Sequence, residues 1–331
     1  MSLHRLSATA LAALAIGLTA PVALAETAPT SAPATAASLP VIHHRQVVVD
    51  GTILHYREAG PADAPVLLLL HGFPTSGEMY RDLMSRLGDR YRVIAPDYPG
   101  FGFSEAPARE TFAYTFQHYA ELMAGLTDAL GIERYALYVM DYGAPVGFRL
   151  AVARPERVTA LITQNGNAYD DGIGPFWTPI KAYWRTGQTA ERNALTAGLT
   201  PEATKWQYTN GVPTDRLDRV SPANWTLDQA LLDRPGVREI MLDLFHDYRT
   251  NVALYPRWQA WMRERRPPTL AVWGANDEIF LFAGAQAYAR DNPQAEIHRI
   301  DSGHFALESH GPEIADLVRD FLDRKVASEN R

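Results

Sequence analysis

The chain has 331 residues, of which 47% are hydrophobic and 21% are charged, a composition typical of a globular protein with room for one large α/β domain or two small ones. Its formal net charge of −7 and the lack of a basic stripe argue against a nucleic-acid-binding protein. The chain contains no cysteine, which excludes disulfides and thiolate metal sites, and its other potential ligands show no metal-site spacing. We therefore expect neither a cofactor nor a metal.

The N-terminal region has the layout of a secretory signal. A short basic start is followed by an apolar run over residues 11–20, and Ala23 and Ala25 frame a small-residue cleavage site. This pattern predicts a cleaved signal peptide over residues 1–25, and hence an exported protein, periplasmic or secreted, without a membrane segment after cleavage. An uncleaved anchor is the alternative. Residues 26–40 are mostly Ala, Thr, Pro and Ser, which cannot build a core and predict a flexible leader.

From residue 44 onward, strand-like and helix-like segments alternate along the chain. Such alternation predicts an α/β fold in which a mostly parallel sheet carries helices on both faces. A hairpin is expected around Asp50-Gly51, between strands over 46–50 and 52–57. The other expected strands are 66–70, 91–95, 135–140, 158–163, 269–273 and 296–300, and the expected helices are 78–87, 115–130, 282–290 and 312–325.

The alternation is interrupted over residues 166–262. This stretch has no convincing buried strand but several helical patterns rich in aromatic residues, and it holds six of the seven tryptophans. The sequence therefore predicts a helical insertion in an α/β core that is formed by residues 41–165 and 263–331.

Three chemistry-bearing residues follow expected strands: Asp141, Asp277 and His304. Parallel strands place their carboxyl ends at one edge of the sheet, where ligands bind. Each residue alone has an ordinary interpretation, as a helix cap, a turn residue or a histidine without a catalytic role. Together they stand in the order nucleophile, acid, histidine that hydrolases use. At the nucleophile position a carboxylate can attack an electrophilic carbon directly and form an ester, whereas an esterase needs a hydroxyl there.

The turn His71-Gly72-Phe73-Pro74 directly follows the expected strand 66–70. It is open to interpretation as a simple glycine-proline turn. In this position, however, the backbone N–H of Phe73 could meet that of Tyr142 and form an oxyanion hole.

These segments resemble the α/β-hydrolase superfamily, in its branch of epoxide hydrolases and haloalkane or haloacetate dehalogenases with an Asp nucleophile. The resemblance implies that Asp141 attacks the substrate carbon, that His304 activates water to cleave the ester, and that Asp277 orients the histidine. It also implies that residues 166–262 form a cap over the pocket. The matching motifs span residues 41–325 and are 71–74, 97–104, 138–147, 273–277 and 303–305.

Within this branch, the leaving group distinguishes epoxide from halide chemistry. Tyr142 and Phe73 occupy the positions where haloalkane dehalogenases usually carry the halide-binding Trp and Asn. Tyr248, in the segment 247–251, resembles the cap tyrosine that activates an epoxide, although haloacetate dehalogenases carry a tyrosine in a similar segment. Tyr183 is the expected second donor. Tyr169 and Trp177 are its competitors.

The resemblance thus predicts an epoxide hydrolase-like enzyme that converts an epoxide to a diol, with a small apolar organic substrate and water as its partners. A haloalkane or haloacetate dehalogenase is the alternative. A non-catalytic scaffold that binds a small apolar ligand is a further one, although a binder has no need for both Asp277 and His304.

Overall fold

The computed structural model describes residues 39–326. The predicted signal peptide, nearly all of the predicted leader and the last five residues lie outside this range. Within it, no helix is both long and apolar enough to cross a membrane.

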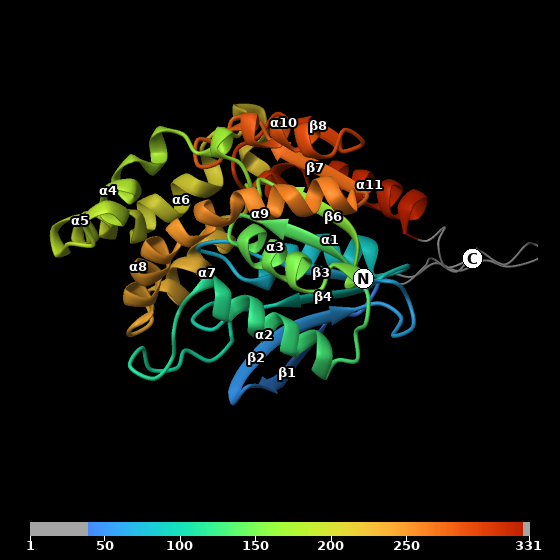
Figure 1. Ribbon diagram of the computed structural model, residues 1–331, viewed down its shortest axis with the longest axis horizontal. Coiled ribbons are helices and arrows are strands. Elements are labelled where there is room, and N and C mark those ends of the chain that lie inside the picture. Colours follow the sequence, from blue (N-terminus) through green and yellow to red (C-terminus); the bar gives the residue numbers. More distant parts are fainter. Residues whose placement is uncertain (1–38, 327–331) are drawn as a thin grey trace, which may run out of the picture. The chain divides into compact units, whose positions relative to one another are not determined.

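The centre of the described chain is an eight-stranded sheet with the strand order β1-β2-β4-β3-β5-β6-β7-β8 (Figure 1). The hairpin β1–β2 pairs antiparallel with β4, and every other neighbouring pair is parallel. The strands are β1 (His43–Val49), β2 (Thr52–Ala59), β3 (Val66–Leu70), β4 (Arg92–Pro96), β5 (Tyr135–Met140), β6 (Val158–Gln164), β7 (Thr269–Gly274) and β8 (Glu296–Ile300).

Helices cover both faces of this sheet, as the alternation predicts. In β3, Leu67 and Leu69 belong to the apolar core beneath α1 and α11, whereas Leu68 and Leu70 belong to the core beneath α2, α3 and α10. The two-residue period of a strand thus buries a continuous apolar run on both sides. These helices are α1 (Arg81–Leu87), α2 (Phe116–Ala129), α3 (Gly143–Ala153), α10 (Phe282–Asp291) and α11 (Ala306–Lys325).

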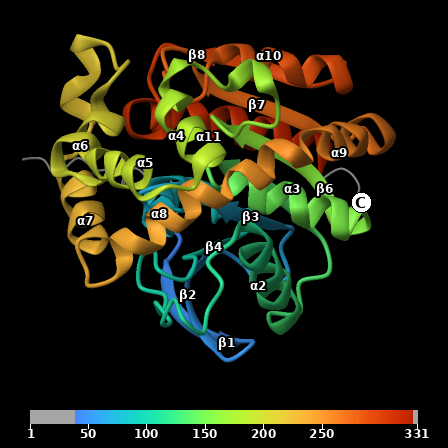
Figure 2. The same ribbon diagram turned by 60° about the vertical axis from the view of Figure 1, so that its left-hand side comes forward.

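Six α-helices lie between β6 and β7, where the sequence predicts a helical insertion. Figure 2 shows α4 to α8 gathered on one side of the sheet and α9 running back along α3. The only strand-like pairing of this segment in the described range is an isolated bridge between Ile173 and Phe280. The helices are α4 (Thr178–Thr186), α5 (Thr189–Ala194), α6 (Pro201–Thr209), α7 (Pro222–Leu232), α8 (Val237–Asp247) and α9 (Arg249–Arg265).

Two expected helices differ from the observed ones at their starts. The expected helix 78–87 is a 3-10 turn, Gly77–Tyr80, followed by α1. The expected helix 312–325 begins earlier, at Ala306, and kinks at His310, whose φ of −130° and ψ of 27° are not helical. Pro312, two residues later, marks the start of a new straight segment, so the sequence pattern reveals only the part after the kink.

Candidate active site

Asp141 lies in a sharp turn between β5 and α3. Its φ of +48° is uncommon for a residue with a side chain. The turn packs tightly against the end of β3: a Cβ on Gly143 would stand 2.0 Å from the Leu70 carbonyl oxygen, and a Cβ on Gly72 would stand 2.3 Å from the Asp141 Cβ. A strained backbone of this kind occurs where the fold holds a functional side chain in place.

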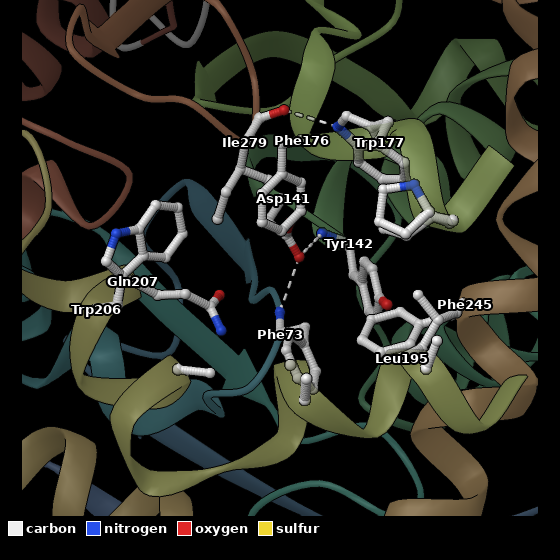
Figure 3. A pocket seen from close by; sticks show the side chains of 16 residues that line it. Phe73, Asp141, Tyr142, Phe176, Trp177, Leu195, Trp206, Gln207, Phe245 and Ile279 are labelled. Carbon is white, nitrogen blue, oxygen red and sulfur yellow. Dashed lines mark hydrogen bonds between the residues drawn. The ribbon is translucent and has the colours of Figure 1, made fainter. Parts of the chain in front are cut away.

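Two backbone N–H groups converge on one oxygen of Asp141. Phe73 N donates to Oδ1 at 2.8 Å and Tyr142 N at 2.6 Å, so the structure brings the two predicted donors together (Figure 3). The residue is 4% exposed. Burial raises the pKa of Asp141, and the positive charge of His304 and the two N–H donors oppose that rise. Because Oδ1 is occupied, Oδ2 is the oxygen left to react.

The turn that carries Phe73 is held by the 97–104 motif. The His71 ring accepts a hydrogen bond from Tyr98 N at 3.2 Å, and its Nδ1 lies 2.9 Å from the Gly72 carbonyl oxygen. Asp97 is fully buried and binds the Arg57 guanidinium at 2.8 Å. Although burial alone would raise it, the pKa of Asp97 is lowered to about 2 by hydrogen bonding and nearby positive charge. A fixed carboxylate therefore anchors the loop behind the oxyanion turn.

His304 lies between the two predicted carboxylates. Its Nδ1 is 2.8 Å from Asp277 Oδ2, and its Nε2 is 3.6 Å from Asp141 Oδ2. Nε2 is buried and has no hydrogen-bond partner within the described chain. With the Nδ1 proton donated to Asp277, Nε2 is free to accept a proton from water beside Asp141.

Asn165 is a site residue that the sequence analysis missed. It directly follows β6 with a φ of +47°, donates to Asp277 Oδ2 at 2.8 Å, and accepts from Gly274 N at 3.0 Å. Ile279 N donates to the other carboxylate oxygen at 2.7 Å. Two donors thus fix the Asp277 carboxylate toward His304. An Asn-Gly pair directly after a buried strand is the signal that could have identified this position.

The pKa of His304 carries a testable consequence. Burial lowers it, but the charge and hydrogen bond of Asp277 and the charge of Asp141 outweigh burial, so the net pKa lies above the ordinary 6.5. A base must be neutral to accept a proton, so we expect turnover to rise with pH, with its midpoint at the pKa that His304 has while Asp141 is esterified and uncharged. Asp277→Asn removes a negative charge and should move that midpoint to lower pH.

The measurement is kcat against pH for the wild type and Asp277→Asn, with Asp316→Asn, on the exposed side of α11, as the charge-matched control. A midpoint that stays in place or rises in Asp277→Asn would contradict this electrostatic account.

An apolar cavity of about 350 Å³ opens above Asp141, between the strand ends and the insertion (Figure 3). Apart from Asp141, the lining residues that carry polar side-chain atoms are Tyr142, Gln207 and two tryptophans. Trp177 donates its indole N–H to the Ile279 carbonyl oxygen at 2.7 Å. The remaining walls are mainly apolar and include Phe73, Phe176, Ile180, Leu195, Phe245 and Ile279.

The two tyrosines predicted to protonate the leaving group, Tyr248 and Tyr183, do not line this cavity. Tyr248 is buried, with its ring 4.5 Å from that of Trp177 and 6.0 Å from that of Tyr142, so it lies behind two residues that line the cavity. Its buried hydroxyl interacts with the phenol of Tyr255. Tyr183 is not brought to the cavity, because its ring packs on His246 of α8 at 4.6 Å.

Two further placements bear on the donor assignment. Tyr169 packs against Tyr288, away from the cavity lining. The Tyr142 hydroxyl, to which the sequence analysis gave no role, is buried without a partner on a residue that does line the cavity. Over residues 39–326 there is no group of three or more His, Cys, Asp or Glu side chains that could hold a metal ion.

Comparison with known proteins identifies the family of this chain. A family model described as alpha/beta hydrolase fold matches residues 65–311. An uncharacterized hydrolase of Saccharomyces cerevisiae is 46% identical over 279 residues, which are 83% of this chain and 95% of the yeast protein. Haloalkane dehalogenase 2 of Mycobacterium bovis is 39% identical over 242 residues, 69% of this chain and 76% of that protein.

Among solved structures, the epoxide hydrolase VrEH1 of Vigna radiata matches with a TM-score of 0.67 and 23% identity, covering 86% of this chain and 98% of that one. A likeness at that identity shows a common fold.

Proposed function

This chain belongs to the α/β-hydrolase fold family, in its haloalkane dehalogenase and epoxide hydrolase branch, and on that premise we propose that it hydrolyses an epoxide to a diol through an ester on Asp141. The observation that carries the proposal is that the two carboxylate oxygens of Asp141 have different surroundings. Oδ1 is held by two N–H groups, while Oδ2 faces His304.

In the first step, Asp141 Oδ2 attacks an epoxide carbon. The carbon–oxygen bond of the ring breaks, its electron pair goes to the ring oxygen, and that oxygen takes a proton from an acid. The product is an ester whose carbonyl oxygen is Oδ1, already bound by the Phe73 and Tyr142 N–H groups. The apolar cavity removes water from the carboxylate and so favours its attack.

In the second step, His304 Nε2 takes a proton from water, and the water oxygen bonds to Asp141 Cγ. The charge that develops on Oδ1 is stabilised by the same two N–H groups. Asp277 stabilises the imidazolium. The bond between Cγ and Oδ2 then breaks, the alcohol oxygen takes the proton from His304, and the diol leaves with the original Asp141 oxygen. The second water proton, left on the Asp141 carboxyl group, returns to the phenolate that protonated the epoxide, so both groups are restored.

The proton for the epoxide oxygen comes, in this proposal, from the phenols of Tyr142 and Tyr248. Burial raises the pKa of both hydroxyls, and the nearby Asp141 charge adds to the rise, so both stay protonated near neutral pH. The Tyr142 hydroxyl is buried without a partner, which supports its use as a donor, and the Tyr248 ring lies 6.0 Å from that of Tyr142. Tyr142 takes the role that Tyr183 was expected to fill.

Dehalogenation is the second candidate, because a haloalkane dehalogenase is 39% identical to this chain. The ester chemistry is the same, but a halide leaves without needing a proton. A leaving halide needs N–H donors in the cavity. The geometry gives this candidate less support, because the indole N–H of the cavity-lining Trp177 already donates to the Ile279 carbonyl oxygen.

Two variants distinguish epoxide hydrolysis from dehalogenation. Tyr142→Phe and Tyr248→Phe remove a proton donor without changing ring volume. We expect at least one of them to lower kcat/KM for an epoxide by about 10²-fold or more, the usual contribution of a general acid, with a much smaller effect on halide release from an alkyl bromide of the same chain length. Tyr183→Phe is the matched control, because the Tyr183 ring packs on His246 of α8, whereas the Tyr248 ring packs against the cavity-lining Tyr142 and Trp177.

Diol formation and halide release are measured on the two substrates. The epoxide assignment fails if the wild type releases halide but opens no epoxide, or if neither phenol affects ring opening.

A further inference from the structure

Gln207 on α6 is a buried polar side chain without a partner. It is 6% exposed, and its carboxamide makes no hydrogen bond within residues 39–326. Because Gln207 lines the cavity, its unpaired amide is available to bind a ligand or a water molecule there. Figure 3 shows the amide pointing into the cavity, on the opposite side of Asp141 from Tyr142.

Gln207 lies where the nucleophile and the base meet. It lines the main cavity together with Asp141, and it adjoins His304 and Asp277 across a closed gap that has no water-sized space of its own. His304 Nε2, which faces Asp141 Oδ2 at 3.6 Å, is likewise without a hydrogen-bond partner there.

Helix α6 is fixed against the loops that carry the acid and the histidine. The Tyr208 ring stacks on that of Phe305, the residue after His304, at 4.1 Å and 2°. Just past the helix, the Gly211 carbonyl oxygen accepts from Asn276 Nδ2 at 2.8 Å, beside Asp277. The position of Gln207 relative to His304 is therefore set by packing on both sides.

We propose that Gln207 binds and orients the water that hydrolyses the Asp141 ester, an inference that rests on the proposed ester mechanism. The water has two protons, one of which is accepted by His304 Nε2 and the other by Gln207 Oε1. This leaves an oxygen lone pair directed at Asp141 Cγ. During the step, the water proton moves to His304, the bond from the water oxygen to Cγ forms, and the bond from Cγ to Oδ2 breaks. Gln207 keeps its own protons throughout.

The test separates the two chemical steps in single turnovers followed by rapid quenching and intact-mass measurement, with 1,2-epoxyhexane and 1-bromohexane as probes. Gln207→Met replaces the amide by an apolar chain of similar length. We expect the ester on Asp141 to form at nearly the wild-type rate and to hydrolyse about 10- to 100-fold more slowly, the scale of losing one hydrogen bond to a reacting group. Gln207→Glu keeps an acceptor oxygen at the same reach and should hydrolyse the ester faster than Gln207→Met.

Glu202→Gln, on the exposed side of α6 and outside the cavity lining, is the control, and the unfolding temperature of each variant reports folding. A purely structural role would slow both steps together and lower the unfolding temperature, which would overturn the inference. Slower ester formation with unchanged hydrolysis would place Gln207 at the leaving group and also overturn it. If the wild type forms an ester with neither probe, the proposed function itself fails, and the water-binding role fails with it.

Discussion

Asp141→Asn is expected to abolish turnover, by about 10⁴-fold or more, while leaving the protein folded. A neutral amide cannot attack carbon, so no ester forms. The fold should tolerate the change, because Asn has the same shape, readily adopts a φ near the observed +48°, and can accept both N–H groups through its own Oδ1.

The Asp141→Asn variant is also expected to be at least as stable as the wild type at alkaline pH. Burial raises the pKa of Asp141, so the folded state holds this proton more tightly than the unfolded state does. Stability therefore falls as pH rises through these pKa values, and the ionised carboxylate destabilises the protein above them. Asp141→Asn removes that effect, so at alkaline pH, where His304 is neutral, its unfolding temperature should equal or exceed that of the wild type. An Asn variant that turns over substrate at a comparable rate would refute the nucleophile assignment.

His304→Gln is expected to stop the reaction after its first step. Asp141 keeps its two N–H donors and its free Oδ2, so the ester still forms. Without a base to activate water, hydrolysis should fall by about 10³-fold or more, and the ester should accumulate on the chain. Intact mass should show one added substrate per chain, and peptide mapping should place it on Asp141.

Two controls make this result specific. His310→Gln changes a buried histidine that hydrogen-bonds Ser309 and is outside the cavity lining, so it should turn over normally and accumulate no ester. The double variant Asp141→Asn/His304→Gln should carry no adduct. An adduct on any other residue, or ester hydrolysis by His304→Gln at the wild-type rate, would contradict the assigned roles.

The core of the site was predictable because strand ends are visible in the sequence. Strands β5 and β8 begin and end as expected, and the residues just beyond β5, β7 and β8 converge because parallel strands share an edge. Asp141, Asp277 and His304 could therefore be placed side by side without knowing how any helix packs.

The insertion was less predictable, because helical periodicity does not fix how a helix is rotated against its neighbours. Tyr183 packs on His246, whereas Gln207, two helices further on, faces Asp141. These directions depend on aromatic contacts such as Tyr208 with Phe305, which join segments far apart in the sequence. Asn165 was missed for a related reason: its partner Asp277 is distant in sequence and meets it only through the pairing of β6 with β7.

The central claim is that water attacks the Asp141 carboxyl carbon and not the substrate. A single turnover of the wild type in water enriched in the heavy oxygen isotope tests it most directly, with an excess of enzyme over 1,2-epoxyhexane. The account predicts an unlabelled diol and one heavy oxygen in the peptide that contains Asp141, because the oxygen delivered to the product comes from the carboxylate. A labelled diol with an unlabelled Asp141 peptide would show that water opens the substrate directly, and would contradict the account.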